Sequence, residues 1–249
     1  YKNIAISVMM LYYQFYCGFS GQPSIDMLTL NFYNTVFTAI PIVIFSLMDS
    51  PVECLETLMK YPKIYNTSRT LHTGIFWKAQ IKAFVDAAIC FFIPYYATFY
   101  SGSDSIDGLY AVGRISYVAL QAVVTLEVLM IARHYTTLFI AFVLYSWFIV
   151  FPFFYLFDWS MQILRVPDPG QAGMSTQIFS SAAAWLQMIC VIGLSIGLRF
   201  SEKGFKVIFY PDDVQIISEM EVGQGKAEAI KASLLNKRLP GVKNAIGDP

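Results

Sequence analysis

The chain has 249 residues, of which 56% are hydrophobic and only 14% are charged, whereas about 25% of the residues in ordinary soluble domains are charged. Its 17 basic and 17 acidic residues give a formal net charge of zero, so there is no overall charge that would attract nucleic acid or an acidic partner. This composition is typical of a membrane protein and excludes an ordinary soluble catalytic domain.

Six segments are long and apolar enough to cross a membrane, because a helix needs about 20 apolar residues to span a hydrocarbon core of ~30 Å. The predicted spans are, in chain order, Asn3–Ile25, Met27–Met48, Ala83–Ser103, Ile115–Ala132, Tyr135–Phe157 and Ile178–Leu198. None shows the alternation of a strand, and open sheet edges cannot face lipid. We therefore predict an all-α polytopic membrane protein, with a transmembrane domain over residues 1–200 and a tail over residues 201–249.

The basic residues predict the orientation of these spans, since they collect on the cytoplasmic side of membrane proteins. With the predicted spans, 15 basic residues fall on one side of the membrane and two, Arg114 and Arg165, on the other. Both termini are accordingly expected in the cytoplasm. The turn between the first two spans, Gly18 to Asp26, contains no basic residue and is expected in the lumen.

Polar side chains line one face of each of the first two spans. Asn3, Ser7 and Gln14 recur at spacings of four and seven residues, which places them on one helix face. The second span has a polar cluster before Pro41, made up of Asn31, Asn34, Thr35 and Thr38. Pro41 has no N–H, so a carbonyl one turn earlier loses its partner and a kink is favoured. The two stripes fit either hydrogen bonds that hold the bundle together or a transport pathway.

Lys2 is the one charge at the start of the first span, and it has two interpretations. It is either a flank that reaches back to the cytoplasmic interface or a charge within the bilayer. If the lumenal boundary lies near Gly18, Lys2 is about 24 Å below it at 1.5 Å per residue. This distance favours a position inside the ~30 Å core, in its cytoplasmic part.

The remaining titratable groups predict no catalytic or metal site. Asp86 lies four residues after Lys82 on the same helix face, and Glu127 lies about two turns before Arg133. We expect both acids to form structural pairs or to reach the interface. The sequence contains no Gly-rich phosphate loop, no set of nucleophile and base, and no metal-ligand cluster.

Several short blocks resemble the type-4 P-type ATPases, the phospholipid flippases. The stretches that resemble their fifth and sixth membrane helices are Tyr1-Lys2-Asn3, Gln14-Phe15, Gly18 to Gln22, Tyr33-Asn34 and Phe37 to Pro41. Later stretches similar to the same family are Tyr61 to Tyr65, Phe76-Trp77, Arg133 to Thr136 and Tyr210-Pro211.

This resemblance implies that the chain is the C-terminal membrane portion of a flippase, from the fifth to the tenth transmembrane helix plus the cytoplasmic tail. The full-length enzyme is expected to use ATP and Mg²⁺ to move phospholipid headgroups from the exoplasmic to the cytoplasmic leaflet. The ATP and Mg²⁺ sites belong to domains absent from this sequence, so the fragment is expected to be inactive alone. The family also implies a two-span accessory beta-subunit at the lumenal face, and a multi-pass location in the plasma membrane or the Golgi and endosomal system.

The resemblance places Lys2 and Asn3 beside the lipid headgroup path. With Ser7 and with Asn34 and Thr38 facing the same groove, they form the predicted substrate-binding set. Three alternatives stay open: a non-catalytic membrane scaffold or assembly subunit derived from such an ATPase, an ion pump, and a generic channel. An ion pump is disfavoured because Asp26 is the only acid between Asn3 and Met48, whereas hard cations need carboxylate ligands.

Overall fold

The structure is a computed structural model that describes residues 1–49, 73–101, 108–132, 135–164 and 173–209. The chain divides into two compact units. The first comprises Tyr1–Asp49 and Leu71–Lys203, and the second comprises Ser50–Thr70 and Gly204–Pro249. Only Gly204–Phe209 of the second unit lies within the described residues, so the architecture below is that of the first unit.

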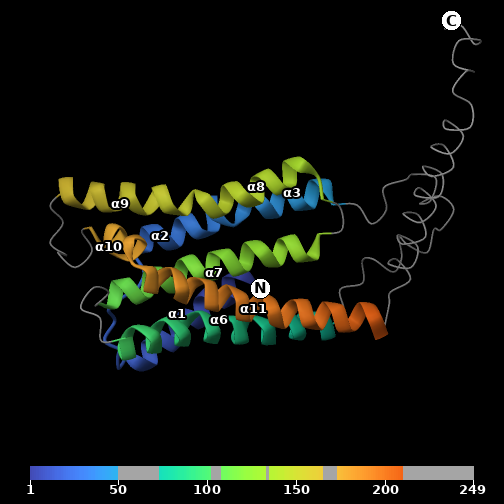
Figure 1. Cartoon of the computed structure of the whole chain (residues 1–249), viewed down its shortest axis with the longest axis horizontal. Helices are drawn as coiled ribbons and strands as arrows, with labels where there is room; N and C mark the ends of the chain where they lie inside the picture. The colour runs from blue at the N-terminus through green and yellow to red at the C-terminus, as the bar shows by residue number, and fades with distance from the viewer. Residues whose placement is uncertain (50–72, 102–107, 133–134, 165–172, 210–249) are drawn as a thin grey trace, which may run out of the picture. The chain divides into compact units, whose positions relative to one another are not determined.

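All regular secondary structure in these ranges is helical (Figure 1). The elements are α1 (Lys2–Tyr16), α2 (Met27–Phe32), the π-helix η1 (Tyr33–Phe37), α3 (Ala39–Met48), α6 (Thr73–Ser101), α7 (Leu109–Ile131), α8 (Thr137–Phe148), α9 (Val150–Leu164), α10 (Met174–Ser180) and α11 (Ala182–Phe209). Five helical stretches are long and apolar enough to cross a membrane, namely Met27–Met48, Thr73–Tyr100, Leu109–Ile131, Thr137–Ile163 and Ala182–Phe209. The predicted all-α polytopic class is confirmed.

The first predicted span is shorter as a helix than expected. α1 has 15 residues and ends at Tyr16, because Gly18 and Phe19 both adopt positive φ angles, of 62° and 56°, a conformation that stops an α-helix. A sixth membrane crossing by this segment and the cytoplasmic position of the termini stay predictions.

Several other boundaries differ from those predicted, among them the start of α7, which lies at Leu109 rather than at Ile115. α6 begins at Thr73, ten residues before Ala83, and Lys78 and Lys82 in its first three turns both pair with Glu202 of α11. α11 continues to Phe209, past the predicted end at Leu198. Part of the predicted long loop Asp158–Ser180 is helical as well, at the end of α9 and in α10.

α7 is the central helix of the first unit. In the membrane-length segment of α7, 67% of the residues are buried inside the protein, whereas 28–33% are buried in the segments of the other four stretches. α1, α3, α6, α8 and α10 all contact it, and Figure 1 shows it between α3 and α8 on one side and α6 and α11 on the other. Tyr117 at its middle is fully buried and makes edge-on ring contacts with Tyr33 and Phe154.

A buried ion pair joins α7 to α9 and α10. Arg114 Nη1 lies 2.7 Å from Asp158 Oδ1 and donates a 2.8 Å hydrogen bond to Ser175 Oγ. The backbone N–H of Ser175 in turn donates to Asp158 Oδ2 at 2.7 Å. Arg114, one of the two basic residues assigned to the lumenal side, is therefore a buried structural residue near the start of α7.

Candidate functional site

Two of the predicted substrate residues, Lys2 and Thr38, meet where the second span departs from α-helical geometry. The α-helix α2 is followed by η1, in which the N–H of Thr38 donates to the carbonyl of Tyr33, five residues earlier, at 3.1 Å. Thr38 Oγ1 donates to the same carbonyl at 2.6 Å. Such single π-turns inside α-helices are frequent at functional sites.

Pro41 explains why the helix changes geometry here. In an α-helix its N–H would donate to the carbonyl of Phe37, but proline has no N–H. Side chains from two other helices supply the missing donors: Gln121 Nε2 of α7 donates to Phe37 O at 3.1 Å, and Ser146 Oγ of α8 also donates to it. Gln121 Nε2 additionally lies 3.0 Å from Ser146 Oγ, so the break is fixed by a buried polar network.

Lys2 of α1 binds directly to this break. Its Nζ donates to Thr38 Oγ1 at 2.8 Å, and the hydroxyl of Tyr33 donates to the backbone carbonyl of Lys2 at 3.3 Å. Thr38 is buried, with 2% of its surface exposed, and Lys2 is half-buried. The two hydrogen bonds fix the start of α1 against η1.

The structure thus brings Lys2 and Thr38 of the predicted set together. Asn3, Ser7 and Asn34 instead have exposed side chains, the first two on a face of α1 that continues into the exposed Leu11 and Phe15. These three residues present polar groups at the surface of the first unit and do not line the Lys2–Thr38 contact.

Three residues of the site were missed from the sequence: Tyr33, Gln121 and Ser146. Gln121 carried a usable signal, because an amide in the middle of an apolar span is costly unless it is hydrogen-bonded. Tyr33 and Ser146 carried none, since tyrosine and serine are common in such segments.

The two acids predicted within spans form structural pairs, as expected, and Asp86 does so with a partner other than the one suggested. Asp86 of α6 pairs with Arg199 of α11 and accepts a hydrogen bond from Tyr1, instead of pairing with Lys82. Glu127 of α7 lies 3.5 Å from Arg199 and 3.9 Å from Lys82. Its suggested neighbour Arg133 lies outside the described residues.

The site offers no metal centre. No group of three or more His, Cys, Asp or Glu side chains that could hold a metal ion occurs within the ranges that the structure describes. What the arrangement provides is a primary amine and a hydroxyl at a helix break, with exposed neutral polar groups on the same two helices.

Comparison with known proteins agrees with the resemblance. Residues 1–212 match the family described as the phospholipid-translocating P-type ATPase C-terminal region. Similar curated proteins include phospholipid-transporting ATPase VD of Macaca fascicularis, 34% identical over 55% of this chain and 20% of the relative. Human phospholipid-transporting ATPase VB is 38% identical over 42% of the chain and 7% of the relative, and human phospholipid-transporting ATPase IG is 29% identical over 79% and 18%. The chain matches a fifth or less of the length of these relatives.

Proposed function

Because the chain belongs to the C-terminal region of the phospholipid-translocating P-type ATPases, we propose that it is part of an ATP-driven phospholipid translocase. In this proposal the full-length protein moves lipid headgroups from the exoplasmic to the cytoplasmic leaflet. The relatives named above are phospholipid-transporting ATPases, which supports the substrate class.

The observation that carries the proposal is the hydrogen bond from Lys2 to Thr38 at the helix break. An ammonium group has three protons to donate, and this bond uses one of them. A positive charge in a membrane span is costly unless it has a partner, and the phosphate of a headgroup is a partner of opposite charge. Asn3, Ser7 and Asn34 add neutral hydrogen-bonding groups on the same two helices.

Within the part of the chain that the structure describes, no residues fit ATP or Mg²⁺. The described residues hold no metal-ligand cluster, and the sequence contains neither a Gly-rich phosphate loop nor the family's DKTG phosphorylation motif. We therefore propose that nucleotide and metal bind elsewhere in the full-length protein, and that this chain contributes the part of the membrane domain that contacts lipid. The accessory beta-subunit at the lumenal face is likewise part of the proposal.

The test is lipid transport by the full-length protein in vesicles, with lipid-stimulated ATP hydrolysis measured in parallel. A hydrogen bond to a charged group contributes about 1.5–3 kcal/mol, so Lys2→Ala is expected to lower lipid-stimulated turnover about tenfold or more. Lys2→Arg keeps the charge and is expected to lose less, and Thr38→Val should fall between the two.

Two matched controls separate the site from general effects. Ser46→Ala removes a hydroxyl that bonds only its own helix, to Ile42 O, and Lys78→Ala removes an exposed lysine at the start of α6. Both should keep most of the activity. Unchanged turnover in Lys2→Ala would reject the assignment of Lys2, and a full-length protein without lipid-stimulated ATP hydrolysis would favour the scaffold alternative.

A further inference from the structure

A buried polar network lies at the start of α1, one residue before Lys2. The hydroxyl of Tyr1 donates to Asp86 Oδ2 of α6, and the same carboxylate oxygen pairs with Arg199 Nη2 of α11. The guanidinium group of Arg199 also lies over the ring of Tyr1, 5.6 Å from the ring centroid. Asp86 is 1% exposed and Arg199 is 7% exposed. The side chain of Tyr1 is therefore held between α6 and α11.

The positions of Tyr1 and Lys2 are coupled, because the two residues are consecutive in one helical turn. The N–H of Ala5 donates to Tyr1 O at 3.0 Å, so Tyr1 belongs to the first hydrogen-bonded turn of α1. Consecutive side chains on an α-helix point about 100° apart, since one turn has 3.6 residues. Tyr1 is directed at α6 and α11, and Lys2 lies on a different face of the helix, where it bonds to Thr38. A rotation of α1 that released Tyr1 would also move Lys2 relative to Thr38.

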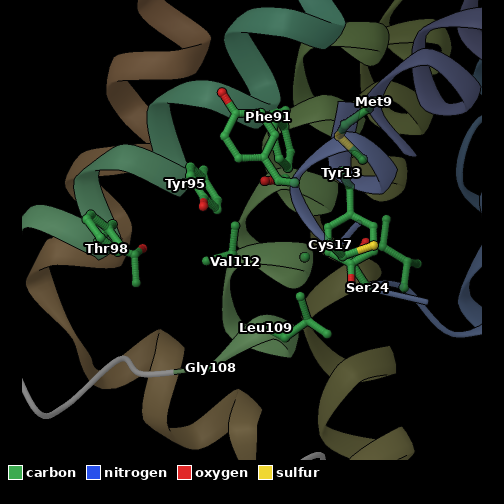
Figure 2. Close-up of a pocket in the computed structure, with 15 residues that line it drawn as sticks. Met9, Tyr13, Cys17, Ser24, Phe91, Tyr95, Thr98, Gly108, Leu109 and Val112 are labelled. Atoms are coloured by element: carbon green, nitrogen blue, oxygen red, sulfur yellow. The ribbon is translucent and has the colours of Figure 1, made fainter. Parts of the chain in front are cut away.

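Packing constrains α1 less at its opposite end. A cavity of about 460 Å³ is lined there by residues of α1, α6 and α7. Figure 2 shows Met9 and Tyr13 of α1 on one side of it and Phe91 and Tyr95 of α6 on the other. Protein interiors are otherwise close-packed, and a cavity leaves the side chains around it without contacts on one side. The polar contacts at the start of α1 are therefore the main constraint on the orientation of Lys2.

The ion pairs of the network balance one another and do not include Lys2. Arg199 Nη1 lies 3.5 Å from Glu127 Oε1, in addition to the contact with Asp86. Lys82 Nζ lies 3.9 Å from Glu127 Oε1 and 3.1 Å from Glu202 Oε2. The charged members are three cations and three carboxylates, namely Lys78, Lys82, Arg199, Asp86, Glu127 and Glu202. The network thus holds Tyr1 without neutralising the ammonium group of Lys2.

We propose that Tyr1, held by Asp86 and Arg199, is a positioning residue that directs Lys2 at the headgroup of the bound phospholipid. This inference rests on the proposed function, since Tyr1 acts here only through Lys2. The network limits the positions of the Lys2 ammonium group before lipid binds. A group that is already ordered loses less conformational freedom on binding, which increases affinity.

The test measures ATP hydrolysis by the purified full-length protein in mixed micelles of detergent with phosphatidylcholine, phosphatidylethanolamine or phosphatidylserine. The dependence on the amount of lipid gives kcat and the KM for the lipid that stimulates most. Tyr1→Phe keeps the ring beside Arg199 but removes the hydroxyl that bonds to Asp86. It is expected to raise this KM about threefold to tenfold, the effect of one hydrogen bond, with little change in kcat.

Tyr16→Phe is the matched control. Its hydroxyl also joins α1 to α6, 2.9 Å from Tyr96 Oη, but it lies at the opposite end of α1. Removal of this hydroxyl should leave the KM for lipid unchanged.

A double variant separates positioning from a general structural effect. If Tyr1 acts through Lys2, Tyr1→Phe has no further effect on the KM for lipid once Lys2→Ala is present. A purely structural role would raise KM by the same factor with and without Lys2. Melting temperatures show whether each variant folds. If Tyr1→Phe does not fold, Asp86→Asn, which weakens both contacts of the carboxylate, takes its place in the same comparison.

The results distinguish this inference from the proposed function. Lys2→Ala is itself expected to raise the KM for lipid, and an unchanged KM would reject both the role of Lys2 and the role of Tyr1. If Lys2→Ala raises KM but Tyr1→Phe does not, the positioning role is overturned and the role of Lys2 stands. The same conclusion follows if Tyr1→Phe raises KM equally in the Lys2→Ala background.

Discussion

Gln121 stabilises the fold through a backbone carbonyl that proline leaves without a partner. It donates to Phe37 O and contacts Ser146 in a buried network. Gln121→Leu keeps the approximate volume but removes one of the two donors to Phe37 O, since Ser146 Oγ still donates to it, and one hydrogen bond contributes about 0.5–1.5 kcal/mol. We expect a lower midpoint of SDS-induced unfolding for the full-length protein. Thr35→Val, which removes an exposed hydroxyl bonded only to Asn31 O of its own helix, should have almost no effect, and an equal shift in both variants would contradict the prediction.

Arg199 compensates two carboxylates from different helices, Asp86 and Glu127. Removal of one partner from a buried pair costs about 3–5 kcal/mol because a charge stays buried without compensation. Arg199→Met should therefore destabilise the protein strongly in the same unfolding measurement, and the double variant Arg199→Met with Asp86→Asn should recover part of the loss. Lys78→Ala, which breaks the exposed pair with Glu202, should cost about 1 kcal/mol or less. A loss in Arg199→Met no larger than this would argue against the buried network.

At the residue scale, the sequence predicted which side chains form polar contacts better than it predicted the residues that they contact. Lys2 and Thr38 were both predicted as substrate-binding residues, and the structure places them in contact, whereas their role in lipid binding stays a prediction. Asp86 was expected to pair with Lys82 on its own helix, but its partner Arg199 is 113 positions further along the chain. Helical spacing shows which residues share one helix face, whereas pairs between helices depend on packing that one sequence does not reveal.

At the scale of elements, the second span shows which features of a helix the sequence pattern can predict and which it cannot. Its limits, Met27 and Met48, coincide with those of the helical stretch, since both ends are marked by a loss of apolar residues. Pro41 predicted a kink but not its form. The π-helix η1 depends on donors from α7 and α8 that replace the missing N–H, and these helices come much later in the sequence.

Gly113 allows α7 to approach the segment before α2. A Cβ atom at this position would lie 2.2 Å from the carbonyl oxygen of Ser24, so Gly113→Ala requires the backbone to move and should destabilise the protein by about 1–3 kcal/mol. Gly197→Ala in α11 is the matched control. Nothing lies within 4 Å of its added Cβ, and alanine has the higher helix propensity, so this variant should be neutral or slightly more stable. Equal melting temperatures for the two variants would contradict the close approach.

At the scale of the whole molecule, composition predicted a membrane bundle but not its centre. The membrane-length segment of α7 has a mean hydropathy of 1.6, within the range of 1.4–2.1 for the other four segments. Yet 67% of its residues are buried, against 28–33% in the others. Lipid and protein interior are both apolar, so hydropathy does not distinguish a helix that faces lipid from one that faces other helices. Buried polar residues such as Arg114 and Gln121 mark α7 as the central helix more clearly than its apolar residues do.

The uneven distribution of basic residues makes the orientation testable. With 15 basic residues on one predicted side and two on the other, the turn that contains Ser20 should be lumenal and the tail that contains Ser233 cytoplasmic. In sealed microsomes, with the native cysteines replaced, Ser20→Cys should react with a membrane-impermeant maleimide only after detergent is added. Ser233→Cys should react without detergent. Labelling of both positions before detergent would contradict the orientation, because the five membrane-length stretches between Ser20 and Ser233 should place the two sites on opposite sides of the membrane.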